Sequence, residues 1–89
     1  MKINKNELLK DIEFLNSNYQ YFYYVLNDKN YFKVLEFNKK TVEKIEKTLN
    51  KYELILIKSN KDKFINCIYN HICTLVNIYT NIWVDPNDK

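Results

Sequence analysis

The chain has 89 residues, of which 46% are hydrophobic and 16% aromatic, and its formal net charge is +3. This length corresponds to one domain, residues 1–89, and the apolar content excludes a wholly disordered protein. The pI of 8.8 falls short of the value above about 9 that is typical of a dedicated nucleic-acid-binding domain.

The residue choice excludes several kinds of site. The sequence contains no glycine, alanine or arginine, as codon bias in an AT-rich genome would produce, and without glycine a nucleotide-binding glycine loop cannot form. Cys67 and Cys73 are too far apart on one predicted helix for a disulfide. We therefore expect free thiols and a reducing, cytoplasmic location. The N-terminus shows no signal-peptide pattern.

A first helix is predicted over about residues 6–27. Apolar residues recur there at alternating intervals of four and three, which is typical of one buried helix face. Asn4, followed three residues later by Glu7, resembles a capping box at the start of this helix. The seam consists of Leu8, Ile12, Leu15, Tyr19, Phe22 and Leu26.

The same spacing predicts a second helix over about residues 30–58, after a turn at Asn27 to Asn30. A strand over residues 52–57 is the alternative for its last part, which is rich in β-branched and aromatic residues. Asn38 is the one polar residue of this seam, and we expect it in or beside a helix contact. The seam consists of Tyr31, Leu35, Asn38, Val42, Ile45, Leu49, Tyr52 and Leu56.

A third helix is predicted over about residues 60–84, with Ser59 as its cap and a short polar tail over residues 85–89. Pro86 disfavours helical geometry at Asp85 and so ends the helix. Its seam consists of Ile65, Ile68, Ile72, Leu75, Tyr79 and Ile82. Three such seams joined by short turns predict an all-α fold, an antiparallel three-helix bundle with coiled-coil-like packing.

The chain has more apolar side chains than one seam on each helix can bury. Such surplus apolar and aromatic residues are typical of protein interfaces. The run from Tyr19 to Tyr24 places aromatic groups on every side of the first helix, and the segment from Leu54 to Ile57 is apolar throughout. A wider intramolecular core and base stacking are the alternatives for the aromatic run. The predicted interface residues are Phe14, Tyr21, Tyr24, Phe32, Phe37, Leu54, Ile55, Ile57, Asn70, Asn77 and Trp83.

The third helix has no acidic or basic residue from Phe64 to Val84, a stretch long enough to cross a bilayer. Asn66, Asn70 and Asn77 lie on one stripe, however, and unpartnered amides in hydrocarbon are unfavourable. The stripe favours an ordinary bundle helix or a face covered by a protein partner. A C-terminal membrane anchor remains as an alternative.

A set of lysines on the second helix recurs every seven residues and could follow an anionic surface. Glu36 with Lys40 and Glu43 with Lys47 are favourable helical ion pairs, which indicate an ordinary solvated face instead. The possible anion-binding residues are Lys33, Lys40, Lys44, Lys47, Lys51 and Lys58.

Cys67, His71 and Cys73 are residue types that bind zinc, but Cys73 lies on another side of the helix and no fourth ligand is evident. We predict no catalytic, cofactor-binding or metal-binding residue, and hence a non-enzymatic protein. The leading hypothesis is a helical protein-interaction module, either self-associating or a subunit or regulator of a larger assembly. A nucleic-acid-binding accessory protein and a small tail-anchored protein are the alternatives.

Overall fold

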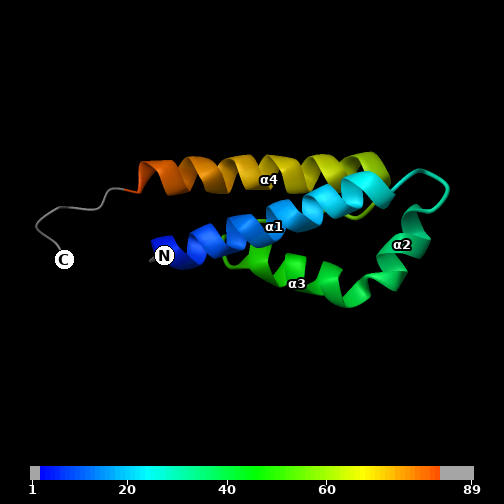
Figure 1. Cartoon of the computed structure of the whole chain (residues 1–89), viewed down its shortest axis with the longest axis horizontal. Helices are drawn as coiled ribbons and strands as arrows, with labels where there is room; N and C mark the ends of the chain where they lie inside the picture. The colour runs from blue at the N-terminus through cyan, green and yellow to red at the C-terminus, as the bar shows by residue number, and fades with distance from the viewer. Residues whose placement is uncertain (1–2, 83–89) are drawn as a thin grey trace, which may run out of the picture.

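The computed structural model describes residues 3–82, and this part of the chain is helical with no strand. Its four helices are α1 (Lys5–Val25), α2 (Tyr31–Phe37), α3 (Lys39–Asn50) and α4 (Lys61–Asn81). In Figure 1, α1 and α4 run antiparallel along the molecule, while α2 and α3 turn back beneath α1. The all-α prediction is confirmed. The prediction of three helices is wrong, because the second predicted helix is divided.

Helix α1 is capped by a side chain at its start and ends where the backbone becomes extended. The side chain of Asn4 accepts a hydrogen bond from the backbone N–H of Glu7 at 3.0 Å, which confirms the predicted cap. The chain leaves the helix at Leu26, whose backbone is extended. The predicted seam is confirmed, since all its members are buried except the half-buried Tyr19.

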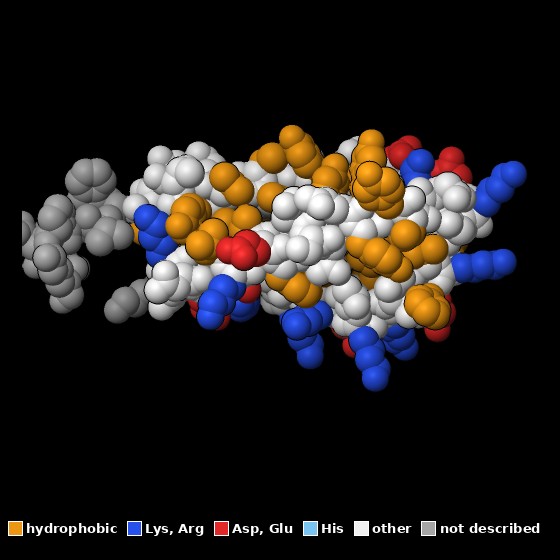
Figure 2. Space-filling view, viewed as in Figure 1, with side chains coloured by type: hydrophobic (Ala, Val, Ile, Leu, Met, Phe, Trp, Pro, Cys, Tyr) orange, Lys and Arg blue, Asp and Glu red, His pale blue; other side chains and the backbone are white. Residues whose placement is uncertain are grey.

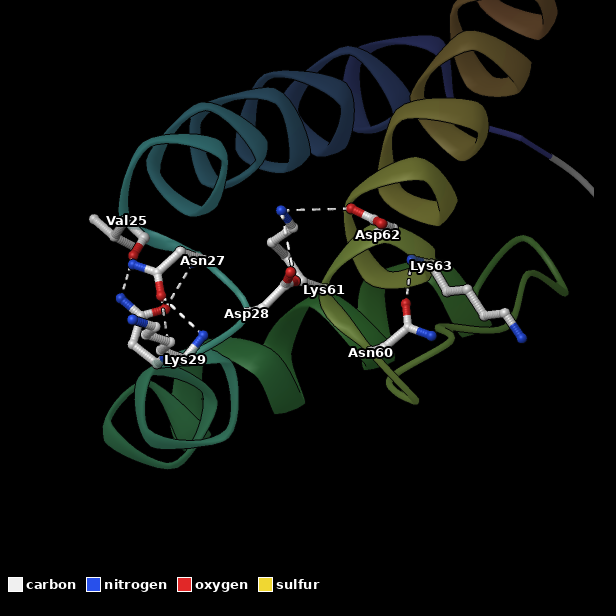
Figure 3. A network of polar contacts seen from close by, with 9 residues as sticks. Val25, Asn27, Asp28, Lys29, Asn60, Lys61, Asp62 and Lys63 are labelled. Carbon is white, nitrogen blue, oxygen red and sulfur yellow. Dashed lines mark hydrogen bonds and ion pairs between the residues drawn. The ribbon is translucent and has the colours of Figure 1, made fainter.

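Asparagine side chains hold the turn between α1 and α2 (Figure 3). The Asn30 amide donates to the carbonyl of Val25 at 2.7 Å, so it satisfies a carbonyl in the last turn of α1. Its Oδ1 accepts from the N–H of Asn27, also at 2.7 Å. Nearby, Lys61 at the start of α4 lies 3.7 Å from Asp28, which links this turn to the other helix. Short polar side chains thus replace the glycine that such turns often use.

The predicted helix over 30–58 breaks at Asn38, which has φ −103° and ψ 26°. Its side-chain amide donates to the carbonyl of Val34 at 2.8 Å and to the hydroxyl of Tyr21 at 3.3 Å. A polar side chain that bonds the carbonyl four residues earlier bends a helix. The seam period continues across this break, and so the pattern alone did not reveal it. The predicted contact of Asn38 with a neighbouring helix is confirmed.

The second correction concerns residues 51–60, which are not helical. Helix α3 ends in a motif in which Leu54 N–H donates to the carbonyl of Leu49 and Glu53 N–H donates to that of Asn50. Glu53 has φ 59°, the left-handed conformation usually given to glycine. The chain then returns toward α4 in irregular conformation, so neither the helix nor the strand alternative for residues 52–57 holds.

Helix α4 begins one residue later than expected. Asn60, not Ser59, is its cap, because the Asn60 side chain accepts from the N–H of Lys63 at 2.9 Å (Figure 3). The helix ends at Asn81. Residues 83 and 84 of the predicted helix, and the predicted tail at 85–89, lie outside the described residues. No helix in residues 3–82 is long and apolar enough to cross a membrane.

The core lies between α1, α3 and α4. The rings of Phe22 and Phe64 meet edge to face with centroids 5.2 Å apart, and Tyr31 packs on Phe64 at 5.9 Å. The Tyr31 hydroxyl donates to the carbonyl of Lys58 at 2.8 Å, so this buried polar atom has a partner. Phe64 and Cys67 are buried although neither belongs to the predicted seam of the last helix. Cys67 contacts the irregular segment that replaces the end of the second predicted helix, through Ile55 and Ile57.

Candidate interaction surfaces

The first surface is the aromatic end, which we define as Tyr21, Tyr24, Phe32 and Phe37. It lies where the last turns of α1 meet α2, and Figure 2 shows hydrophobic side chains gathered at this end of the molecule. Tyr24, Phe37 and Phe32 are 88%, 87% and 72% exposed. The ring of Phe32 contacts Tyr31 edge to face, with centroids 5.0 Å apart, and the Tyr21 hydroxyl accepts from Asn38. The outer faces of these rings are left in water.

A hollow of about 410 Å³ lies beside Phe32 and is lined by residues of α2 and α3 and by Lys58. Its apolar lining comes from Phe32, Leu35 and Val42, and its charged lining comes from three glutamates and two lysines. Glu46 on this rim is paired with Lys58 at 3.1 Å. The hollow is large enough to accept one or two side chains of a partner.

Phe14, a predicted interface residue, is half-buried rather than exposed to solvent. It packs against the core, and the ammonium of Lys44 lies 5.0 Å from the centre of its ring. This cation–π contact joins α1 to α3. Phe14 therefore contributes to packing within the chain.

The segment from Leu54 to Ile57 alternates between buried and exposed side chains. Leu56 is buried and Leu54 half-buried, whereas Ile55 is 75% exposed and Ile57 46%. The surplus apolar surface predicted here is thus confirmed for Ile55 and Ile57, but on an extended segment rather than a helix.

Cys67 and His71 hold this segment against α4. The buried Cys67 thiol donates to the carbonyl of Ile55 at 3.3 Å and accepts from the N–H of Ile57 at 3.4 Å. His71 Nε2 donates to the same Ile55 carbonyl at 2.8 Å. Cys73 is exposed, and both thiols are free. Over residues 3–82, no group of three or more His, Cys, Asp or Glu side chains is placed to hold a metal ion.

On α4, the predicted interface residues Asn70 and Asn77 are both exposed. The backbone carbonyl of Asn70 accepts a hydrogen bond from the Thr74 hydroxyl at 3.0 Å. The backbone carbonyl of Asn77 accepts one from the Asn81 side-chain amide at 2.8 Å. Trp83, the last predicted interface residue, lies outside the described residues.

Within residues 3–82, four large exposed apolar residues are not among the predicted interface residues: Leu9, Tyr23, Tyr69 and Val76. Tyr19 stacks on both Tyr23 and Tyr69, with centroids 5.9 and 5.7 Å apart, and so joins α1 to α4 at this surface. The sequence does contain a pattern from which this surface on α4 could have been predicted. Asn66, Tyr69, Cys73, Val76 and Thr80 recur by threes and fours as a second seam on α4.

The lysines do not form one continuous track, because the predicted helix that carried them is broken. Lys33, Lys40 and Lys47 are exposed on α2 and α3. Lys44 covers Phe14, and Lys58 pairs with Glu46. Lys51 lies 2.7 Å from Asp11 and 3.4 Å from Glu7. Three of the six predicted anion-binding lysines thus have partners within the chain.

Asp11 on α1 also accepts a hydrogen bond from Tyr52, just beyond α3. Burial raises the pKa of Tyr52, and the hydrogen bond to Asp11 with the negative charges of Asp11 and Glu7 raises it further. Burial lowers the pKa of Lys51, but Asp11 and Glu7 outweigh that effect and leave it raised. This cluster joins α1 to the end of α3.

The chain matches no protein-family model, no curated protein and no solved structure.

Proposed function

We propose that this protein is a non-enzymatic helical interaction module that binds a protein partner through the aromatic end. The observation that carries the proposal is the exposure of Tyr24, Phe32 and Phe37, each more than 70% accessible to water. Large aromatic side chains left exposed are unfavourable in water, and such residues are enriched at the centre of protein interfaces.

The hollow beside Phe32 supports this reading. An interface gains most from side chains that enter a concave, apolar site and exclude water from it. The hollow offers an apolar floor from Phe32, Leu35 and Val42, and the glutamates and lysines of its rim can accept and donate hydrogen bonds to a partner.

The proposal is tested with a Tyr24→Ser, Phe32→Ser, Phe37→Ser variant. Its control is Glu13→Ser, Gln20→Ser, Glu36→Ser, which removes exposed polar side chains from the same two helices. Sedimentation of purified protein across a dilution series detects self-association, and chemical cross-linking in the native cell detects other proteins. We expect the aromatic variant, but not the control, to lose the proteins that cross-link to the wild type in the cell.

A wild-type protein that sediments as a monomer at every concentration and yields no cross-linked protein would overturn the proposal. Circular dichroism shows whether both variants keep the helical content of the wild type. Since all six positions are exposed, we expect them to fold.

Nucleic-acid binding is the second candidate, supported by the exposure of Lys33, Lys40 and Lys47 at intervals of seven residues. Each phosphate contact should contribute about 0.7 to 0.9 to the slope of log affinity against log salt concentration. Replacing Lys33, Lys40 and Lys47 with glutamate should then abolish binding to DNA or RNA. Absence of salt-sensitive binding by the wild type would exclude this candidate.

A further inference from the structure

Helix α4 has a second, outward seam that the core does not use. Asn66, Tyr69, Cys73, Val76 and Thr80 recur at intervals of three, four, three and four, and all five are exposed. This is the spacing by which helices pack against each other in coiled coils. From Phe64 to Asn81 the helix carries no Lys, Asp or Glu, so the charged neighbours of the seam on its own helix, Asp62 and Lys63, lie before its first residue, Asn66.

Helix α1 widens this seam into a face two helices across. Leu9, Asn16 and Tyr23 recur every seven residues on α1, and all three are exposed. We call these three residues, together with the five of the α4 seam, the neutral face. Tyr19 contacts both Tyr23 and Tyr69, so the two parts are adjacent.

Charged side chains lie at the two ends of the neutral face. At one end, Lys5 lies over the ring of Tyr79, with its ammonium 4.9 Å from the ring centre. At the other end, Lys61 and Asp62 line a hollow of about 370 Å³ together with Tyr23. An apolar and amide-rich strip therefore runs between two charged ends.

We propose that the neutral face binds a second copy of this chain, with the two α4 helices packed antiparallel. The inference goes beyond the proposed function, because it concerns a different surface and names one partner. Each copy has a net charge of +3 and 14 lysines, so most approaches of two copies bring like charges together. On the neutral face two copies can meet without burying a lysine.

The polar groups of the neutral face can also pair with those of an identical face. Amides and hydroxyls both donate and accept hydrogen bonds, so Asn16, Asn66 and Thr80 can pair with the polar groups of an identical face. A two-fold dimer requires such self-complementarity, since the same surface is used by both copies. Glu13 is exposed beside Leu9 and Asn16 on α1, so an acidic side chain borders the face.

The order of residues favours the antiparallel arrangement. Cys73 lies at the centre of the seam, with Asn66 and Thr80 seven residues to either side. A two-fold axis at the centre places Cys73 against its own copy, Asn66 against Thr80, and the large Tyr69 near the smaller Val76. A parallel pair would instead place Tyr69 against Tyr69 and bring both copies of Lys61 together.

The position of Cys73 provides a direct test. Mild oxidation of the purified wild type at micromolar concentration should form a disulfide-linked dimer, because the two Cα atoms at the axis can approach within the roughly 4.4 to 6.8 Å that a disulfide needs. Cys73→Ser should form none. Cys67→Ser should still form it, since the Cys67 thiol is buried.

Orientation is tested in the Cys73→Ser background with single Asn66→Cys and Thr80→Cys variants. An antiparallel dimer predicts that a mixture of the two gives mainly the mixed disulfide. Predominant pairing of each variant with itself would overturn the antiparallel arrangement.

Val76→Lys adds a like charge to each copy of the face and should weaken the dimer by roughly tenfold or more in sedimentation. The matched control is Thr74→Lys, which adds the same charge to α4 outside the seam and should leave the dimer intact. Thermal melts followed by circular dichroism establish that both variants fold.

The outcomes separate this inference from the proposed function. Association that is lost in the Tyr24, Phe32 and Phe37 variant but kept in Val76→Lys would overturn the neutral-face dimer and leave the interaction module standing. A wild type that is monomeric at all concentrations and forms no Cys73-dependent dimer overturns the dimer, whatever other proteins are cross-linked in the cell.

Discussion

The hydroxyl of Tyr52 donates a hydrogen bond to Oδ2 of Asp11 at 2.5 Å, joining two residues that are 41 positions apart in the chain. The ammonium of Lys51 lies 2.7 Å from the same oxygen. The Asp11 side chain is only 14% exposed, so a single carboxylate, mostly removed from water, receives two donors. This contact fixes the end of α3 against the first turns of α1.

Stability should fall at alkaline pH because of this cluster. The folded protein raises the pKa of Tyr52 above the ordinary value of 10.0, through burial first and then through Asp11 and Glu7. A raised pKa means that the stabilisation is fully present below pH 10 and is lost as the pH rises toward the folded-state pKa. We expect urea denaturation midpoints to be constant from pH 8 to 9.5 and to fall above pH 10.

Tyr52→Phe should lower the free energy of unfolding at pH 8 by about 1.5 kcal/mol, the usual size of a hydrogen bond to a charged group. It should also make the decline above pH 10 shallower, because the titrating hydroxyl is gone. Tyr24→Phe is the control, since Tyr24 is highly exposed. An equal alkaline decline in both variants would show that Tyr52 does not control it.

Cys67 should protect the backbone of the segment that follows α3. Its thiol accepts from the N–H of Ile57 at 3.4 Å. In Cys67→Ala, amide hydrogen exchange at Ile57 should therefore accelerate by roughly tenfold. Cys73→Ala removes an exposed thiol from the same helix and should leave this rate unchanged. An unaltered Ile57 rate in Cys67→Ala would mean that packing alone holds the segment.

Glu53→Gly should stabilise the protein. Glu53 has φ 59°, and a side chain costs about 1 kcal/mol there relative to glycine. We expect the free energy of unfolding in urea to rise by about that amount. Glu43→Gly, at an exposed site inside α3, should lower it by about 1 kcal/mol. A loss of stability in Glu53→Gly would show that the Glu53 side chain makes a contact worth more than the strain.

Asn38→Leu should raise the melting temperature and the helical content. The leucine cannot bond the Val34 carbonyl as Asn38 does at 2.8 Å, so that carbonyl becomes available to a continuous helix over α2 and α3. It also adds an apolar group to a half-buried seam position. We further expect sedimentation to show mixed assemblies, because a polar seam residue restricts the choice of partner. A lower melting temperature would indicate that the contact with Tyr21 outweighs both gains.

The sequence by itself determined the helical class and most of the core. Members of all three predicted seams, such as Leu15, Ile45 and Ile68, are fully buried, since burial on one side of a helix imposes its period on the chain. The sequence also predicted the Asn4 cap. It predicted surplus apolar side chains, among them Tyr24, Phe37 and Ile55, because the chain has more apolar residues than one seam on each helix can bury.

Only the tertiary structure decided where the second predicted helix stops and which surplus residues stay exposed. The break at Asn38 and the reversal at Glu53 lie beside contacts with Tyr21, Asp11 and Cys67, which are distant in the chain and leave the local period unchanged. For the same reason Phe14 is covered by Lys44, while Tyr69 and Val76 remain in water. A hydrophobic period tells which residues share a face of a helix, but the packing of other elements decides whether that face is covered.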